Sequence, residues 1–169
     1  MKKAVKPLSI FFGTVIGLLI IDMVSKVLTD GKEFRVIPRV IRFESVHNEG
    51  IAFSFLSGAG IWLIVVTSIL TVAAITAWWF VIMRQMRNKA NEANLGKNIW
   101  FGNVAFAVFI AGAIGNLYDR IAYGHVRDFI RFEFWHTFPI FNFADICLNI
   151  GTVMLIVYLV FFTGNKNAA

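Results

Sequence analysis

The sequence is poor in cysteine and in charged residues. Cys147 is the only cysteine among 169 residues, so no disulfide can form within the chain. It lies in an apolar run, where it fits the role of a small packing residue. Charged residues make up 15% of the chain, whereas hydrophobic residues make up 58% and the mean hydropathy is +0.71. A water-soluble protein of this length cannot bury so much apolar surface. The composition therefore predicts a single integral membrane domain over residues 1–169.

Several functional signatures are also missing. The sequence has no glycine-rich phosphate loop, no serine–histidine or cysteine–histidine arrangement, no internal repeat and no low-complexity segment. His125, His136 and Asp128 match no standard metal-site spacing, so we expect neither a metal nor a cofactor. The net charge of +6 falls mainly in segments that flank apolar runs, and it gives no reason to expect nucleic acid binding.

Four apolar runs are long enough to cross a bilayer as helices. They cover about residues 8–28, 61–83, 99–118 and 143–162. The first run follows three lysines, which is also the pattern of a cleaved signal peptide. No small-x-small cleavage site follows it, so we expect a retained helix. Small residues in the third run favour close helix packing, and tryptophans near the end of the second predict an interfacial aromatic belt.

The remaining segments predict the topology. Alternating apolar residues on both sides of Pro38 indicate two or more short strands within residues 29–60. Residues 84–97 form a polar, basic stretch that we expect to be a loop. The two sides carry eight and seven Lys and Arg residues, and the positive-inside rule then favours cytoplasmic termini. Segments 29–60 and 119–142 are thus expected outside the cytoplasm. The predicted fold is mainly α: four transmembrane helices with a small extracytoplasmic β-sheet and a loop over the site.

Residues 112–145 concentrate polar side chains between two apolar runs. Ionisable groups near membrane depth are costly, which makes them functional candidates. In a four-helix topology Asp128 and Asp145 both fall at the outer face, as do Asp22 and Lys26. Two carboxylates held close together share a proton, so one can activate water while the other polarises a carbonyl. This is the arrangement of an aspartic protease.

The two carboxylates also have purely structural explanations. Asp145 follows Asn142 by three residues, which is the spacing of a capping box at the start of a helix. Asp128 could instead form a surface ion pair with Arg127 or Arg131. The sequence leaves both explanations open.

Other polar and aromatic residues are equally ambiguous. Asp22 and Lys26 are four residues apart on a helix and could simply neutralise each other. Asn116 and Arg120 stand one turn apart, where they could orient the carboxylates or bind a lipid headgroup. Four aromatic residues could form an interfacial belt or line an apolar groove: Phe53, Phe55, Trp135 and Phe138.

Taken together, the motifs of this chain resemble those of the lipoprotein signal peptidases (signal peptidase II). They run in order along the chain: DMVSK at 22–26, HNEGIAFSF at 47–55, GAIGNLYDR at 112–120, HVRDFI at 125–130 and FNFAD at 141–145. The resemblance implies a multi-pass aspartic endopeptidase of the bacterial cytoplasmic membrane, with its active site at the outer face. Such an enzyme cuts a prolipoprotein just before a cysteine that carries diacylglycerol.

The resemblance also implies roles for single residues. Asp128 and Asp145 correspond to the catalytic pair. Seven further positions match residues that support the site or bind substrate: Asp22, Lys26, Asn48, Gly50, Asn116, Arg120 and Asn142. The expected partners are lipid-modified prolipoproteins and membrane lipids, and we expect a monomer.

Three positions depart from the family pattern, and the sequence also allows other functions to be compared. Met23, Ile51 and Arg127 stand where Gln, Ala and an apolar residue are more usual. If the Arg127 side chain faced the dyad, it would favour ionised Asp128. A transporter or channel subunit would instead spread its charges through the membrane depth. A scaffold would not need so many Asn and Asp residues, and a metal-dependent protease would be sensitive to a chelator.

Overall fold

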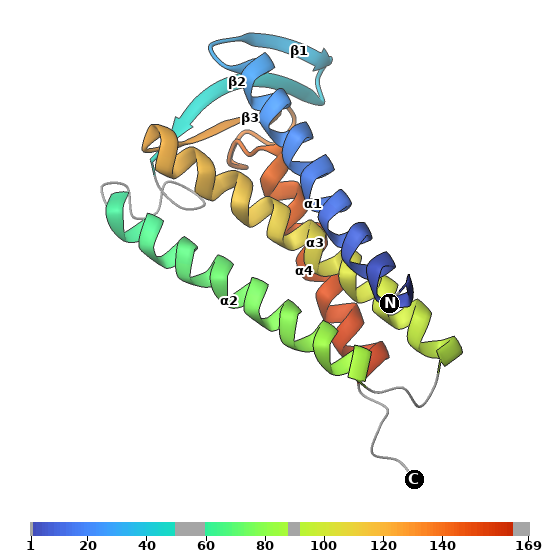
Figure 1. The fold of residues 1–169 in the computed structure, drawn as a ribbon. Coiled ribbons are helices and arrows are strands. Elements are labelled where there is room, and N and C mark those ends of the chain that lie inside the picture. The colour runs from blue at the N-terminus through green and yellow to red at the C-terminus, as the bar shows by residue number, and fades with distance from the viewer. Residues whose placement is uncertain (1, 50–59, 88–91, 164–169) are drawn as a thin grey trace.

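Four long helices and one small sheet make up the structure, a computed structural model that describes residues 2–49, 60–87 and 92–163 (Figure 1). The helices are α1 (Lys2–Thr29), α2 (Gly60–Arg87), α3 (Glu92–Tyr123) and α4 (Phe143–Val157), and α4 continues as a π-helical segment, Tyr158–Thr163. The strands β1 (Glu33–Ile37), β2 (Ile41–Asn48) and β3 (Val126–Phe132) form an antiparallel sheet in that order. The predicted fold class is confirmed in its four long apolar helices and small sheet.

Each long helix contains a stretch that is long and apolar enough to span a membrane. These stretches are residues 8–29, 64–84, 100–123 and 143–161. The sheet lies at the end of the bundle where α1 ends and α4 begins (Figure 1). The residues before α4 and the end of α3 meet the sheet at this same end. The polar motifs of the sequence are therefore gathered at one end of the bundle.

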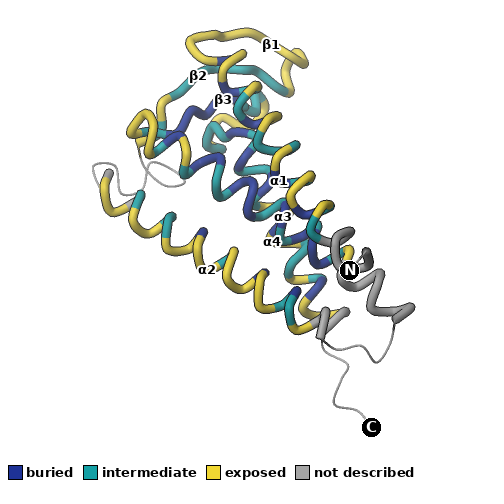
Figure 2. The backbone as a smooth tube through the Cα atoms, viewed as in Figure 1, coloured by how far each residue is buried: buried dark blue, intermediate teal, exposed yellow. Residues whose placement is uncertain are grey.

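Helix α3 forms the centre of the bundle. Figure 2 shows it largely buried, whereas α2 is mostly exposed. Glycines allow α3 to approach its neighbours closely: a Cβ atom on Gly112 would lie 2.4 Å from the carbonyl oxygen of Ala144. A Cβ atom on Gly115 would lie 2.6 Å from Oδ2 of Asp22. The small residues of the third apolar run thus bring α1 and α4 onto α3.

Trp78 on α2 lies in the core rather than in an interfacial belt, and this corrects the sequence prediction. Its indole ring stacks on Phe11 of α1 at 3.7 Å, and its Nε1–H donates to Oδ1 of Asn103 on α3 at 2.8 Å. A buried indole N–H needs a partner, and Asn103 supplies it. The adjacent Trp79 is about half exposed, as expected for a belt residue.

Two further predictions differ from the structure. The segment 84–97 is mostly helical, because α2 continues to Arg87 and α3 begins at Glu92. Helix α3 also ends at Tyr123, not near Tyr118. The extra turn is stable because the carboxylate it carries, Asp119, is paired inside the fold.

Candidate active site

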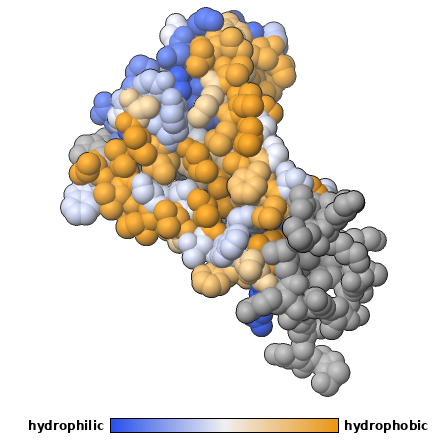
Figure 3. Space-filling model, viewed as in Figure 1, coloured by the Kyte–Doolittle hydropathy of each residue, from blue (hydrophilic) through white to orange (hydrophobic). Residues whose placement is uncertain are grey.

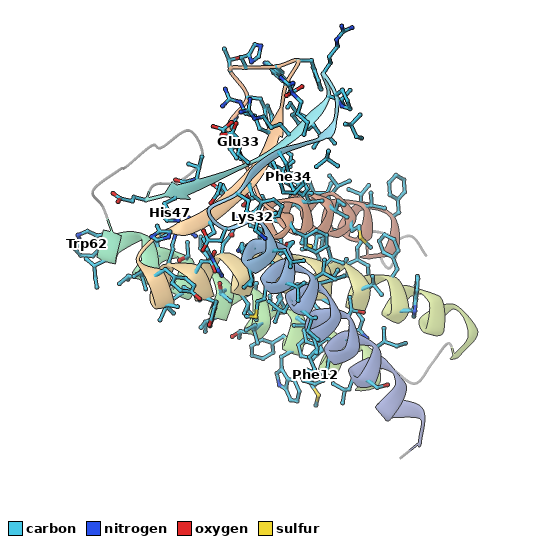
Figure 4. The ribbon with its side chains drawn as sticks, turned by 90° about the horizontal axis from the view of Figure 1, so that it is seen from above. Phe12, Lys32, Glu33, Phe34, His47 and Trp62 are labelled. Atoms are coloured by element: carbon cyan, nitrogen blue, oxygen red, sulfur yellow. The ribbon has the colours of Figure 1, made fainter. Side chains whose placement is uncertain are left out.

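Strand β3 brings together the two segments that carry the predicted catalytic carboxylates. It pairs with β2 so that Asp128 is opposite Val46. A separate bridge joins Ile130 to Phe141: the Ile130 N–H donates to the Phe141 carbonyl at 2.8 Å, and the reverse bond is 3.1 Å. Asp128 therefore lies beside Asn142, the residue that begins α4. Figure 4 shows the sheet from above, with His47 of β2 over the end of α3.

Asn142 links the two carboxylates. Its side-chain Nδ2 donates to Oδ1 of Asp128 at 2.6 Å, and its backbone N–H donates to Oδ2 of Asp145 at 3.0 Å. Its Oδ1 in turn accepts a hydrogen bond from the Asp145 backbone N–H at 3.0 Å, which completes a capping box. The capping explanation for Asp145 is thus confirmed. It is compatible with a site, because the cap fixes Asp145 beside Asn142 and leaves its carboxylate in the groove.

Two more asparagines complete the hydrogen bonds of the pair. Asn48 donates to Oδ2 of Asp128 at 2.8 Å, and Asn116 donates to Oδ1 of Asp145 at 2.7 Å. The Oδ1 atom of Asn116 accepts from Asn142 at 3.0 Å, and Asn48 is linked to both through Asp128. We call these five residues the amide-held cluster: Asn48, Asn116, Asp128, Asn142 and Asp145. Gly50 was expected here but lies outside the described residues.

Burial raises the pKa of Asp128 from its usual value to about 7. The hydrogen bond from Asn48 opposes this shift, and the charge of Asp145 reinforces it. Only 3% of Asp128 is exposed, so the proposed surface ion pair with Arg127 or Arg131 is wrong. A carboxyl with a pKa near 7 exchanges its proton at neutral pH, which suits acid–base chemistry.

Four buried charges form a second cluster below the first. Lys26 contacts Oδ2 of Asp22 at 2.8 Å and Oδ2 of Asp119 at 3.3 Å. Asp119 is also paired with Arg127, whose Nη2 lies 2.9 Å from Oδ1, and whose backbone N–H donates to Oδ2 at 3.0 Å. We call this group the cation-held cluster: Asp22, Lys26, Asp119 and Arg127. The predicted pairing of Asp22 with Lys26 is confirmed.

The cation-held cluster explains two features of the sequence. Arg127, one of the departures from the family pattern, points away from the dyad and toward Asp119, so it does not hold Asp128 ionised through direct contact. Asp119 was not among the predicted site residues, although it lies one position before Arg120 in the same motif. The signal that could have found it is a further acidic residue at the end of an apolar span.

The cation-held cluster contacts the amide-held cluster directly and also anchors the helix that carries Asp145. Lys26 donates to Oδ1 of Asn116 at 3.4 Å, and Oδ1 of Asp22 accepts from the backbone N–H of Ala144 at 2.9 Å. The first contact leaves the Asn116 amide nitrogen directed at Asp145. The second anchors the first turn of α4, which carries Asp145.

An apolar groove opens beside the amide-held cluster. Its volume is about 730 Å³, and Asp128, Asp145, Asn116 and Arg120 lie in its wall. The rest of the wall is mainly apolar and comes from α2, α3, β3, α4 and the segment before α4, including Phe109, Phe132, Phe138 and Phe141. Phe138 is thus a groove residue, whereas Trp135 is about half exposed. Phe53 and Phe55 lie outside the described residues. Arg120 Nη1 donates to the Asn116 carbonyl at 3.4 Å.

Known proteins share both the sequence and this architecture. The family described as Signal peptidase (SPase) II matches residues 14–161. The chain belongs to the signal peptidase II family. A lipoprotein signal peptidase of Pseudomonas fluorescens is 36% identical over 148 residues, which cover 82% of this chain and 79% of that relative. One from Staphylococcus aureus is 35% identical over 166 residues, covering 92% and 93%.

Solved structures agree with this assignment to signal peptidase II. A bacterial membrane enzyme superposes with a TM-score of 0.73 at 32% identity and covers 94% of this chain and 92% of its own. A second bacterial membrane enzyme gives a TM-score of 0.69 at 31% identity, covering 90% and 93%. The chain is therefore a multi-pass bacterial membrane protein and an aspartic peptidase that cleaves prolipoprotein signal peptides. The function predicted from the sequence is confirmed at this level.

Proposed function

We propose that Asp128 and Asp145 are the catalytic pair of this peptidase and that they cut the peptide bond just before the lipid-modified cysteine. The observation that supports this most directly is the position of Asn142. It donates to one oxygen of each carboxylate, so it holds both acids at one groove. Two carboxylates held close together can share a proton, and that is the state in which a carboxyl pair activates water.

The proposed reaction assigns a separate task to each acid. Asp128, whose pKa near 7 lets it hold a proton, donates that proton to the oxygen of the scissile carbonyl. Asp145 takes a proton from water, and the water oxygen attacks the carbonyl carbon to give a tetrahedral diol. Asp145 then passes its proton to the leaving nitrogen, the C–N bond breaks, and a diol hydroxyl returns its proton to Asp128. The products are a carboxylic acid and an amine, and both acids end in their starting states.

The asparagines and Arg120 position the reacting groups in this proposal. Asn48 and Asn142 fix the Asp128 carboxyl from two sides, and Asn116 fixes Asp145. Arg120 contributes positive charge at the wall of the groove. We assign no metal and no cofactor to this chemistry. Among the described residues, no group of three His, Cys, Asp or Glu side chains is arranged to hold a metal ion.

The groove fits a substrate held by a lipid and an apolar helix. Its walls are largely apolar, and its carboxylates lie at the end of the bundle where membrane meets water. A signal helix and an acyl chain could therefore enter from the membrane while water reaches the acids. We infer that the peptidase acts on prolipoproteins that carry the diacylglyceryl group, and that it works as a monomer.

We further propose that both termini are cytoplasmic and that the site faces outward. The basic residues near the start of α1 and between α2 and α3 favour this orientation. A C-terminal fusion to a fluorescent protein that folds only in the cytoplasm should fluoresce, and a fusion to a phosphatase active only outside should be inactive. The reverse pair of results would contradict the orientation.

Replacing either acid should abolish catalysis without unfolding the protein. We expect Asp128→Asn and Asp145→Asn to lower cleavage of a lipidated prolipoprotein by about a thousandfold or more, because each removes a proton-transfer group. A gel-shift cleavage assay with purified protein measures this, run with and without a chelator and with and without the diacylglyceryl group.

Asp30→Asn is the matched control, since Asp30 is an exposed carboxylate at the same end of the molecule. It should cleave at the wild-type rate. Near-normal cleavage by either dyad variant would refute the assignment, and inhibition of the wild type by a chelator would point to a metal peptidase instead.

A further inference from the structure

Three arginines form a row across the sheet. Arg35 of β1 is opposite Arg42 of β2, and Arg42 is opposite Arg131 of β3. Directly opposite side chains on paired strands lie on the same face, where like charges destabilise a sheet. A fourth arginine, Arg39, lies in the turn between β1 and β2 with φ of 63°, a left-handed conformation that few residues other than glycine adopt. The fold therefore gathers four guanidinium groups at one end of the sheet despite an unfavourable arrangement.

Glutamates neutralise only part of this charge. Glu133 accepts from Arg35 Nε at 2.7 Å and from the backbone N–H of Arg39 at 2.8 Å. The hydrogen bond from Arg35 holds the pKa of Glu133 below its usual value. Glu44 accepts two bonds from Arg131, at 2.8 and 3.0 Å, and Arg42 pairs with Glu33. Within the described part of the chain, the Arg39 side chain has no carboxylate partner.

These residues enclose a cavity of about 570 Å³, separate from the groove of the dyad. Its walls contain the four arginines together with Glu44, Glu133, Phe134 and His136. With Glu33 counted as the partner of Arg42, four positive groups face three negative ones, so the cavity keeps a net positive charge. Guanidinium groups bind phosphate oxygens with well-matched geometry. We call this space the arginine cavity.

Exposed apolar and aromatic side chains lie near the arginine cavity. Val36, Ile37 and Val40 at the tip of the hairpin are 40–47% exposed, and Phe134 and Trp135 are 64% and 52% exposed. In Figure 3 hydrophilic and hydrophobic residues lie side by side at the sheet end. The membrane-spanning stretch of α1 ends at Thr29, four residues before β1, so β1 begins within about 14 Å of it. Exposed apolar and aromatic side chains mixed with arginines are typical of segments at a lipid–water interface.

We propose that the arginine cavity binds the phosphate of an anionic phospholipid headgroup and thereby fixes the tip of the sheet to the bilayer surface. Arg39 supplies the guanidinium without a carboxylate partner, and the row of three arginines supplies the surrounding positive potential. The exposed apolar side chains at the hairpin tip contact the acyl region of the same leaflet. This binding site does not depend on the assignment of the dyad.

Native mass spectrometry of the full-length chain in detergent tests the proposal. The protein is titrated with phosphatidylglycerol, phosphatidylcholine and inorganic phosphate in separate series. We expect phosphatidylglycerol to bind most tightly. Arg39→Gly should weaken its binding by about fivefold, and Arg39→Gly/Arg42→Gln by about 25-fold, as expected for loss of one and two cations near an anionic headgroup. Arg84→Gln is the matched control, because Arg84 is an exposed arginine near the C-terminal end of α2, away from the sheet. This variant should bind phosphatidylglycerol like the wild type.

The outcomes separate the proposal from its competitors. Equal phosphatidylglycerol binding by the wild type and Arg39→Gly would overturn the proposal. It would also be overturned if the wild type bound phosphatidylcholine as tightly as phosphatidylglycerol. Inorganic phosphate that binds as tightly as the lipid would show a simple anion site and would also overturn it. Arg39→Gly should keep the wild-type melting temperature, because glycine readily adopts a φ of 63°. If the double variant fails to fold, the single variant alone decides.

Discussion

The amide-held and cation-held clusters lie within one end of the same bundle, yet they satisfy their carboxylates differently. In the first, neutral asparagine side chains donate hydrogen bonds to the two acids. In the cation-held cluster, Lys26 and Arg127 form ion pairs with Asp22 and Asp119. A cation fixes the position of a buried carboxylate through an ion pair, whereas an amide orients a carboxyl that can still accept a proton. One cluster is therefore suited to chemistry and the other to holding helices and strand together.

The contact between the clusters shows how the second supports the first. Oδ1 of Asn116 accepts from both Lys26 and Asn142, so its Nδ2 is directed at Asp145. Asp119 holds the first part of β3 through Arg127, the residue before Asp128. The cation-held cluster thus fixes the positions of the elements that carry the two acids. Three predictions test this division of roles, and they are ordered from the largest expected effect to the smallest.

Removal of the central cation should cause the largest loss of stability. Lys26→Met leaves Asp22 buried without its cation and leaves Asp119 paired with Arg127 alone. Breaking a buried ion pair by removing one partner costs roughly 3–5 kcal/mol. Thermal unfolding in detergent, followed by intrinsic fluorescence, measures the change. The double variant Asp22→Asn/Lys26→Met should recover part of the loss, because it also removes a buried negative charge. If Lys26→Met melts like the wild type, the cluster does not hold the fold.

The amide-held cluster should show itself in the pH dependence of both activity and stability. The pKa of Asp128 near 7 is above its value in the unfolded chain, so the folded state binds the extra proton. The stability from this proton is complete at acidic pH and is lost as the pH rises through about 7. Cleavage should likewise fall about tenfold per pH unit above 7, because the protonated acid is required.

Melting temperatures at pH 5 and pH 8 separate the contribution of Asp128 from that of other groups. The loss of stability toward pH 8 should be smaller in Asp128→Asn than in the wild type, because the asparagine cannot ionise. An identical loss in both proteins would assign the effect to other groups. A cleavage rate that stays constant from pH 6 to pH 9 would show that Asp128 is not the acid.

The pairing of Asp119 with Arg127 should have the smallest effect and should be non-additive. Asp119→Asn leaves Arg127 without its carboxylate partner, and Arg127→Met leaves Asp119 with Lys26 alone, whereas the double variant removes both charges of the pair. We expect the double variant to lose less stability than the sum of the losses in the two single variants. The difference, which is the coupling energy, should be about 1–2 kcal/mol. Both single variants should also lower kcat by several fold, because Asp128 follows Arg127 on β3. Strict additivity would show that the two residues act independently.

The sequence was informative wherever a property depends on neighbours along the chain. Apolar runs located the four helices, and alternation around Pro38 located the hairpin of β1 and β2. The spacing of Asn142 and Asp145 predicted the capping box that the structure contains. The Asp22–Lys26 pair followed from their separation of one helical turn. These features need contacts over only a few residues, so local patterns reveal them.

The sequence was uninformative where partners are distant. Strand β3 was not predicted, because residues 126–132 become a strand only through pairing with β2, about 80 residues away along the chain. Trp78 was placed in an aromatic belt, because the buried Asn103 that binds its indole lies on another helix. Arg127 could be located but not oriented, since its turn toward Asp119 depends on how β3 leaves α3.

The sequence by itself determined that the chain has four apolar runs long enough to cross a membrane, with a few acidic residues near their ends. The physical reason is that backbone groups in a bilayer must bond within their own segment, so long apolar runs become helices regardless of context. Only the tertiary structure decided which acids face amides and which face cations. That choice depends on side chains from α1, α3, β2, β3 and α4 meeting at one point, and their distances cannot be derived from any local pattern.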